Sequence, residues 1–135
     1  MDTKKVIDHI VQWLKDYADQ SGNRGFVIGV SGGIDSALTS TLCALTGLEV
    51  LCLEMPIHQA ASQVNRAQNH INWLKKNYPN VREHHVELTG VFDDLVNTLP
   101  QHDATEQQFL ALANTRARLR MSTLYYFAGL HRYLV

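Results

Sequence analysis

The chain has 135 residues, of which 45% are hydrophobic and 19% charged, and its formal net charge is −1. This length and composition predict one domain with a substantial core. The charge balance argues against binding nucleic acid through its phosphates, and no apolar run reaches the roughly 20 residues of a membrane span. We therefore expect neither nucleic acid nor membrane as a partner.

The first part of the chain alternates between helical and strand patterns. A first helix is predicted by one apolar stripe, formed by Val6, Ile7, Ile10, Val11, Leu14, Tyr17 and Ala18. A strand at 26–30 has almost no polar alternation, which indicates burial on both faces, as in a parallel sheet. A helix over 37–46 follows and ends at Gly47.

The middle of the chain repeats this alternation. A second apolar strand is predicted at 50–53, and Met55-Pro56 closes it because a residue that precedes proline is pushed out of helical space. Ser62 is the expected N-cap of the next helix, which carries apolar residues at helical spacing up to Leu74. The middle segment thus adds one more strand and one more helix.

The last part of the chain predicts a third strand and two further helices. The strand is expected at 85–88 and a short helix at 91–99. A long helix begins at Asp103, with Glu106 completing a capping box, and Tyr133 to Val135 reads as the start of a buried strand. Strands that alternate with helices predict a doubly wound α/β fold, with a parallel sheet and helices on both faces.

The most informative segment is Ser31-Gly32-Gly33-Ile34-Asp35-Ser36, which joins the first strand to a helix. Adjacent glycines allow a tight turn and a close approach of the backbone to a ligand. The free N–H groups and the positive dipole end of the helix attract an anion, and the serine hydroxyls can donate to phosphate oxygens. The segment predicts an anion site at the carboxyl end of the sheet.

Three better-known motifs compete for this segment. A Walker A loop needs a Gly-Lys pair, which the chain lacks, and the intervals between the glycines do not fit a dinucleotide fingerprint. Gly29, Ser31 and Gly33 do fit the nucleophile elbow of α/β-hydrolases. The elbow normally follows several strands, whereas here it follows the first, so a serine hydrolase with Ser31 as nucleophile is a remote alternative.

Asp35 and Ser36 favour another interpretation, because the hexapeptide resembles the pyrophosphate-binding loop of the ATP pyrophosphatases, the PP-loop group. These enzymes split ATP between the α and β phosphates. A carboxylate beside phosphates would repel them unless Mg²⁺ bridges the two, so Asp35 is the candidate metal ligand. A first-turn aspartate that only complements the helix dipole is the structural alternative.

A second motif, Asn114-x-x-Ala117-Arg118-x-Arg120-Met121 with a following Tyr125, lies on the long helix. At 100° per residue Arg118 shares a face with Asn114, while Arg116 and Arg120 lie together on another face. A guanidinium suits a carboxylate or phosphate, although solvated surface arginines are equally compatible with Arg116 and Arg120.

The two motifs, together with Met-Pro after the second strand, resemble the ammonia-dependent NAD⁺ synthetases from about residue 4 onward. The resemblance implies a ligase, in which ATP adenylates the nicotinate carboxylate of deamido-NAD⁺ and ammonia then displaces AMP. It implies Mg²⁺ and a homodimer. A cytoplasmic location is predicted separately, because the N-terminus has no apolar leader pattern and the two cysteines read as free thiols of a reducing compartment. Arg118 would contact deamido-NAD⁺, the backbone of Leu53 and Met55 would contact adenine, and ATP would bind Gly29, Val30, Ser31, Gly32, Gly33, Ile34, Asp35 and Ser36.

The chain also departs from the family pattern. The family's Gly-Thr-x-x-x-x-Glu segment, with a second Mg²⁺ ligand, and its lysine-bearing loop do not occur. The chain therefore reads as the N-terminal portion of such an enzyme. Two alternatives stay open beside the hydrolase: an inactive nucleotide-binding fragment, and another PP-loop enzyme of the GMP synthetase or tRNA-modifying type. Cys43 and Cys52 lack metal-ligand spacing and are expected to be buried free thiols.

Overall fold

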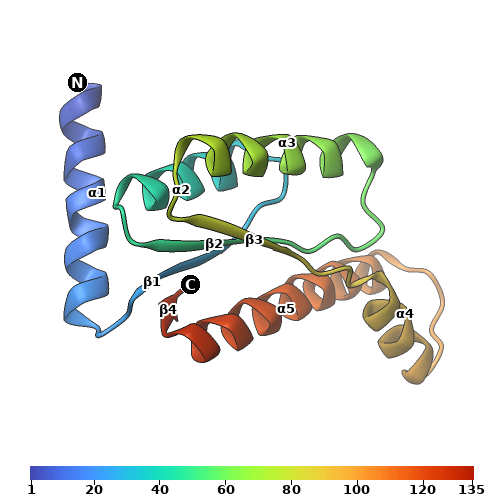
Figure 1. Ribbon diagram of the computed structural model, residues 1–135. Coiled ribbons are helices and arrows are strands. Elements are labelled where there is room, and N and C mark those ends of the chain that lie inside the picture. Colours follow the sequence, from blue (N-terminus) through green and yellow to red (C-terminus); the bar gives the residue numbers. More distant parts are fainter.

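The computed structural model describes all 135 residues, which form a parallel sheet covered by helices (Figure 1). The elements are α1 (Thr3–Gln20), β1 (Gly25–Gly29), α2 (Ile34–Leu45), β2 (Glu49–Glu54), α3 (Ala61–Asn77), β3 (Val81–His85), α4 (Thr89–Thr98), α5 (Glu106–His131) and β4 (Tyr133–Leu134). The predicted doubly wound α/β class is confirmed.

The sheet has four parallel strands in the order β3-β2-β1-β4. The chain moves outward from β1 to β2 and β3, and then returns to the opposite side of β1, where β4 pairs with Gly25 and Phe26. The strand order therefore reverses beside β1. In open α/β sheets ligands bind beyond the carboxyl ends of the strands at such a reversal, which directs attention to the loop that follows β1.

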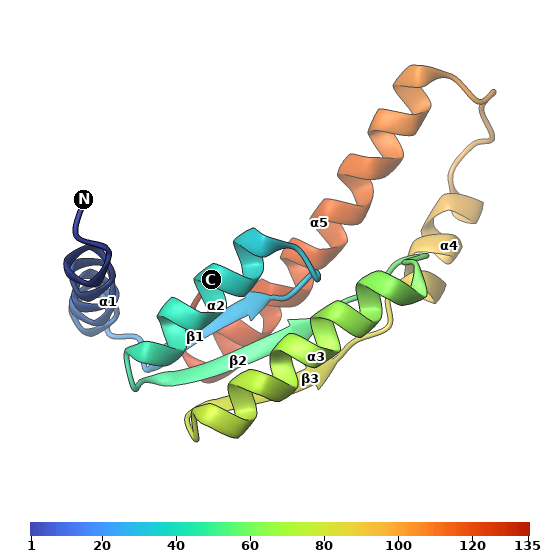
Figure 2. The ribbon, with the colours of Figure 1, turned by 90° about the horizontal axis from the view of Figure 1, so that it is seen from above.

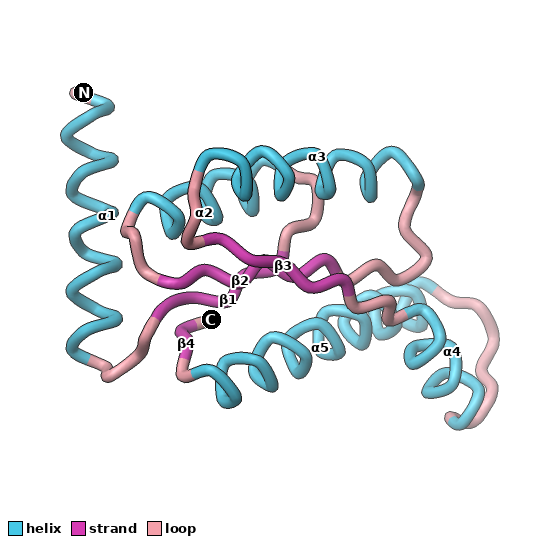
Figure 3. The backbone as a smooth tube through the Cα atoms, viewed as in Figure 1, coloured by secondary structure: helices cyan, strands magenta, loops and turns pink.

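Two apolar layers enclose the sheet (Figures 1 and 3). α2 and α3 lie on one face, with α1 beside them, and α4 and α5 lie on the other. One buried cluster centres on Val50, Ile71 and Leu74, and the second on Leu51, Leu53 and Phe92. Alternate residues of β2 thus enter opposite clusters, as expected for a strand buried on both faces. None of the five helices is both long and apolar enough to cross a membrane.

The two cysteines are free and buried, as predicted. Burial raises the pKa of the Cys43 thiol to about 11 and that of the Cys52 thiol to about 12. Both thiols therefore stay protonated at neutral pH, and neither is a candidate nucleophile.

The third strand lies earlier than predicted, at Val81–His85 instead of 85–88. β3 is an edge strand that pairs only with β2, and in it only Val81 is buried. Because most of its side chains face solvent, the strand lacks the apolar run on which the prediction relied. Val86, which that prediction included, follows the strand.

Four helix starts also differ from the prediction. That of α4 is Thr89 instead of residue 91. α2 begins at Ile34 rather than residue 37, so Asp35 and Ser36 belong to its first turn. Ser62 is not an N-cap, because α3 begins at Ala61 and its N-cap Ala60 makes no side-chain bond. Asp103 does not cap α5; Thr105 does so, accepting a hydrogen bond from the Gln108 amide at 3.1 Å. Thr105-x-x-Gln108 is itself a capping-box sequence.

Candidate functional site: an anion-binding loop beside a small cavity

The loop Ser31–Gly33 and the first turn of α2 form the candidate anion site (Figure 2). They follow β1 at the carboxyl edge of the sheet, beside the reversal of strand order. The backbone amides of Ile34, Asp35 and Ser36 have no hydrogen-bond partner, as is usual for the first turn of a helix. Three free N–H groups at the positive end of the helix dipole provide a site for a phosphate.

Two serine side chains hold the ends of this loop together. The Ser31 amide donates to Ser36 Oγ at 3.1 Å, Ser36 Oγ donates to the Gly33 carbonyl oxygen at 3.3 Å, and the two hydroxyl oxygens lie 3.3 Å apart. The hydroxyls are thereby gathered beside the free amides. No histidine hydrogen bonds to Ser31, so the structure supplies no general base for the hydrolase alternative.

Gly32 is the glycine that the loop requires. Its φ is +89°, and a Cβ there would lie 2.7 Å from the Gln63 carbonyl oxygen of α3. Gly33 has a φ of −88°, and a Cβ there would meet only Ser31 Oγ, at 3.5 Å. The two glycines therefore differ: the turn and the close approach of α3 require Gly32, whereas Gly33 has an ordinary φ and room for a methyl group.

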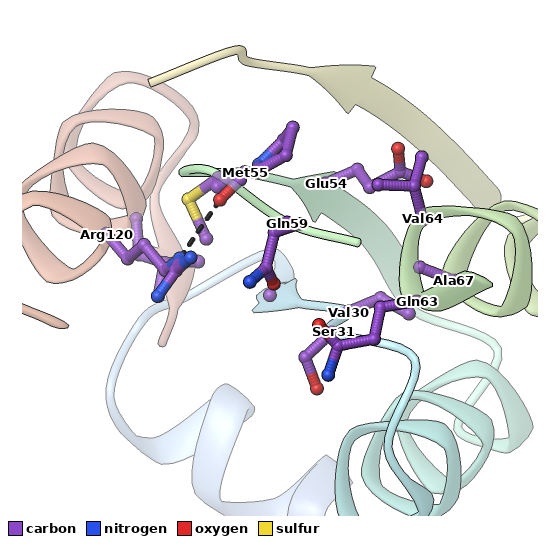
Figure 4. Close-up of a pocket in the computed structure, with 12 residues that line it drawn as sticks. Val30, Ser31, Glu54, Met55, Gln59, Gln63, Val64, Ala67 and Arg120 are labelled. Atoms are coloured by element: carbon purple, nitrogen blue, oxygen red, sulfur yellow. Dashed lines mark hydrogen bonds between the residues drawn. The ribbon is translucent and has the colours of Figure 1, made fainter. Parts of the chain in front are cut away.

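A cavity of about 220 Å³ adjoins the loop (Figure 4). It lies between the loop, the end of β2, the first turns of α3 and the middle of α5, and its lining residues are Gly29, Val30, Ser31, Glu54, Met55, Pro56, Gln59, Gln63, Val64, Ala67, Arg120 and Leu124. Gly29 has no Cβ, and one built there would come within 2.9 Å of the Met55 terminal methyl. A mostly apolar cavity beside an anion loop suits a ligand with a flat base and a charged tail.

Two charged side chains lie on opposite parts of the cavity wall. Arg120 donates from Nε to the Met55 carbonyl oxygen at 3.0 Å. Burial and the nearby charge of Arg116 lower the pKa of Arg120, yet an arginine stays charged. Glu54 is 3% exposed; one of its carboxylate oxygens lies 3.0 Å from His85 Nδ1, and the other has no partner.

The structure brings most of the predicted nucleotide-binding residues together. Gly29, Val30, Ser31 and Met55 line the cavity, and Gly32 to Ser36 form the adjoining loop and turn. Leu53 does not line the cavity: its side chain is buried in the core, and its carbonyl oxygen accepts from the Val30 amide at 2.8 Å.

Arg118 lies apart from this cavity. It is exposed on α5 and reaches only its own helix, donating to the Asn114 carbonyl oxygen at 3.5 Å. Because Arg120 follows two residues later, about 200° further round the helix, the two guanidinium groups serve different surfaces. Arg116 and Arg120 lie one turn apart in the same continuous helix, as predicted, and Arg116 lies over the Phe92 ring at 5.4 Å from its centroid.

Eight of the 12 residues that line the cavity were not among the predicted site residues, and four of these are polar or charged: Glu54, Gln59, Gln63 and Arg120. Gln59 and Gln63 follow the predicted strand that ends near Met55, so the rule that ligands lie beyond strand ends was the available signal. For Arg120 the motif was recognised, but the helical pattern alone gave no information on which face meets the sheet.

The motifs imply two bound groups, a pyrophosphate and a Mg²⁺ ion. The free amides, the serine hydroxyls and the space at Gly32 fit a pyrophosphate group. Asp35 is exposed in the first turn and has no side-chain partner, so its carboxylate is free to bind a cation. No group of three or more metal-ligating side chains occurs in the structure.

Comparison with known proteins shows the family of the chain. The family model for NAD synthase matches residues 6–135. The chain belongs to the NAD synthase family. Its relatives in this family include NH(3)-dependent NAD(+) synthetases of Pyrobaculum aerophilum, 33% identical over 100% of this chain, and of Methanosarcina acetivorans, 34% identical over 96%. The chain spans about half the length of each, 49% in both cases.

Solved structures of the NAD synthase family and of a related synthetase share the fold. An NH3-dependent NAD synthetase of Campylobacter jejuni, 29% identical, has a TM-score of 0.83 over 98% of this chain and 55% of its own. An NMN synthetase of Francisella tularensis, 27% identical, has a TM-score of 0.84 over 98% of this chain and 52% of its own. The α/β fold of the chain is thus that of these synthetases.

Proposed function

We propose that the protein takes part in the ATP-dependent amidation of deamido-NAD⁺ with ammonia to give NAD⁺. The observation that carries this proposal is the loop Ser31–Ser36, with three free helix amides, in a chain of the NAD synthase family. Such a loop binds the pyrophosphoryl part of ATP. Because the chain spans about half of its curated relatives, the activity of the whole enzyme is part of the proposal.

The proposed reaction has two steps, adenylation of the carboxylate and then its conversion to the amide. First, a nicotinate carboxylate oxygen attacks the α phosphorus of ATP; the bond from that phosphorus to the bridging oxygen breaks, and its electron pair leaves with pyrophosphate. Second, the ammonia nitrogen attacks the acyl carbon, the C–O bond to AMP breaks, and the nitrogen loses a proton. No protein nucleophile is required, so the main contribution of the chain is to position ATP and stabilise the leaving pyrophosphate.

Each group of the site has a role in this scheme. The amides of Ile34, Asp35 and Ser36 bind the β and γ phosphates. Asp35 would hold Mg²⁺, which neutralises phosphate charge when bound. The cavity beside Met55 takes the adenosine part, and Arg120 lies on its wall. Arg118, on the other side of α5, is the proposed contact for deamido-NAD⁺.

The test is direct formation of NAD⁺. The chain is incubated with ATP, Mg²⁺, deamido-NAD⁺ and ammonium, and NAD⁺ is measured with a coupled dehydrogenase while AMP and pyrophosphate are quantified. Equal yields of the three products support the proposal. Binding of ATP without product would assign this chain to the nucleotide-binding portion of the enzyme alone, and failure to bind ATP would reject the proposal. Glutamine in place of ammonium tests the nitrogen source.

A second candidate is amidation of the corresponding mononucleotide. It is favoured by the likeness to the structure titled NMN synthetase, which is as close in fold as the NAD synthetase structure. Competition between the mononucleotide and the dinucleotide in the same assay decides between the two substrates. Homodimer formation, which the family resemblance implies, and a cytoplasmic location, which the composition predicts, are expectations that sedimentation and cell fractionation test.

A further inference from the structure

Arg66, on α3, lies against the glycine loop. Its Nε donates to the Gly32 carbonyl oxygen at 3.3 Å. The absence of a Cβ at Gly32 lets α3 come this close, since such an atom would lie 2.7 Å from the Gln63 carbonyl oxygen. This hydrogen bond, from an exposed side chain, holds the guanidinium beside the Gly32 carbonyl.

The charge of Arg66 is unneutralised. It forms no ion pair with any carboxylate, and its two terminal nitrogens have no hydrogen-bond partner. A guanidinium carries five N–H donors, and one of them is used at Gly32. The remaining donors stand beside a loop whose amides at Ile34, Asp35 and Ser36 are also free. A guanidinium and free backbone amides are both donors that suit an anion with several oxygens.

We propose that Arg66 binds the β,γ-pyrophosphoryl end of ATP and stays on pyrophosphate as it leaves. This inference rests on the proposed function, since it assigns a further residue to the same loop. The two terminal nitrogens match two phosphate oxygens, while Nε keeps the guanidinium on the loop. Negative charge grows on the departing pyrophosphate, so a cation held in place there lowers the barrier.

The test compares ligands that do and do not contain the pyrophosphoryl group. Calorimetry measures binding of Mg²⁺-ATP, Mg²⁺-pyrophosphate and AMP to the unaltered chain, Arg66→Gln and Arg66→Lys. We expect Arg66→Gln to weaken ATP and pyrophosphate about tenfold and to leave AMP unchanged, as for one charged hydrogen bond. Arg66→Lys keeps the charge but loses the paired donors, so its loss should be smaller.

Lys76→Gln is the matched control, because it removes one positive charge from the last turn of the same helix. It should leave all three affinities unchanged. Equal pyrophosphate affinity in Arg66→Gln and the unaltered chain would overturn the assignment of Arg66 alone. An equal loss for AMP would also overturn it, since the loop would then simply be distorted. If the unaltered chain binds neither ATP nor pyrophosphate, the proposed function fails, and the role of Arg66 fails with it.

Discussion

Arg120 and Met55, 65 residues apart in the chain, are joined by a hydrogen bond of 3.0 Å from the guanidinium Nε to the carbonyl oxygen. This bond ties the middle of α5 to the end of β2 at the cavity (Figure 4). It fixes the arginine, which is only partly exposed, on the wall facing Ser31 and Gln63. The two informative motifs of the sequence thus meet at one site.

Replacing Arg120 by lysine should weaken ATP binding about tenfold, because an ammonium cannot bond both the Met55 carbonyl and a ligand in one plane. Arg116→Lys is the control: Arg116 lies over Phe92 and does not line the cavity. Calorimetric titration with Mg²⁺-ATP separates the two variants. A similar loss in both would mean that α5 acts through its overall charge.

Gly32→Ala should destabilise the loop far more than Gly33→Ala. An alanine at a φ of +89° costs about 1 to 2 kcal/mol, and its Cβ would also press on the Gln63 carbonyl oxygen. Gly33 has an ordinary φ of −88° and room for a methyl group. Thermal unfolding measures both free energies, and equal destabilisation by the two substitutions would contradict the loop geometry.

Asp35→Asn should weaken ATP binding in the presence of Mg²⁺ and should not weaken it when the metal is chelated, because without metal the carboxylate only repels the phosphates. The carboxylate is exposed, unpaired and in the first turn of α2, so its removal alters charge more than packing. Titrations with Mg²⁺ and with a chelator give the comparison. An equal loss under both conditions would point to a structural role at the helix terminus.

Arg118→Ala should raise the KM for deamido-NAD⁺ by about tenfold or more and leave ATP affinity unchanged. The side chain is exposed and makes only one long bond within α5, so its loss should not disturb the fold. The reverse pattern is expected for Asp35→Asn. If Arg118→Ala weakened both ligands equally, the separate roles of the two residues would be wrong.

His70 should make the fold less stable in acid. Its Nε2 lies 2.9 Å from Ser40 Oγ, and burial lowers its pKa below the ordinary 6.5. The unfolded chain therefore takes up a proton at a higher pH than the folded chain, so stability is lost as pH falls below about 6.5. The melting temperature of the unaltered chain should fall more steeply from pH 7 to pH 5 than that of His70→Gln. Parallel curves would exclude this contribution.

The strand positions could be predicted best where a strand is buried on both faces of the sheet. β2 is buried on both faces, so its apolar run is continuous and was located within one residue at each end. β3 was misplaced because an edge strand needs only one buried residue, Val81. The start of α5 was misplaced because more than one polar residue before the helix could serve as its N-cap. Thr105, and not Asp103, directly precedes the first helical residue.

The site was predictable where local chemistry defines it. The loop Ser31–Ser36 could be recognised from glycines, serines and its place between a strand and a helix. Arg66 and Glu54 could not, because each acts through a neighbour far away in the chain: Gly32 for the arginine and His85 for the glutamate. Such pairs follow from the packing of α3 and β3, which no local pattern contains.

The central claim is that this loop holds ATP while a carboxylate attacks its α phosphorus. It is tested most directly with deamido-NAD⁺ labelled with ¹⁸O in the nicotinate carboxylate, incubated with the protein, ATP, Mg²⁺ and ammonium. Mass spectrometry of the products then locates the label. We predict one labelled oxygen in AMP and none in pyrophosphate. Label in inorganic phosphate, or NAD⁺ formed with unlabelled AMP, would contradict the account.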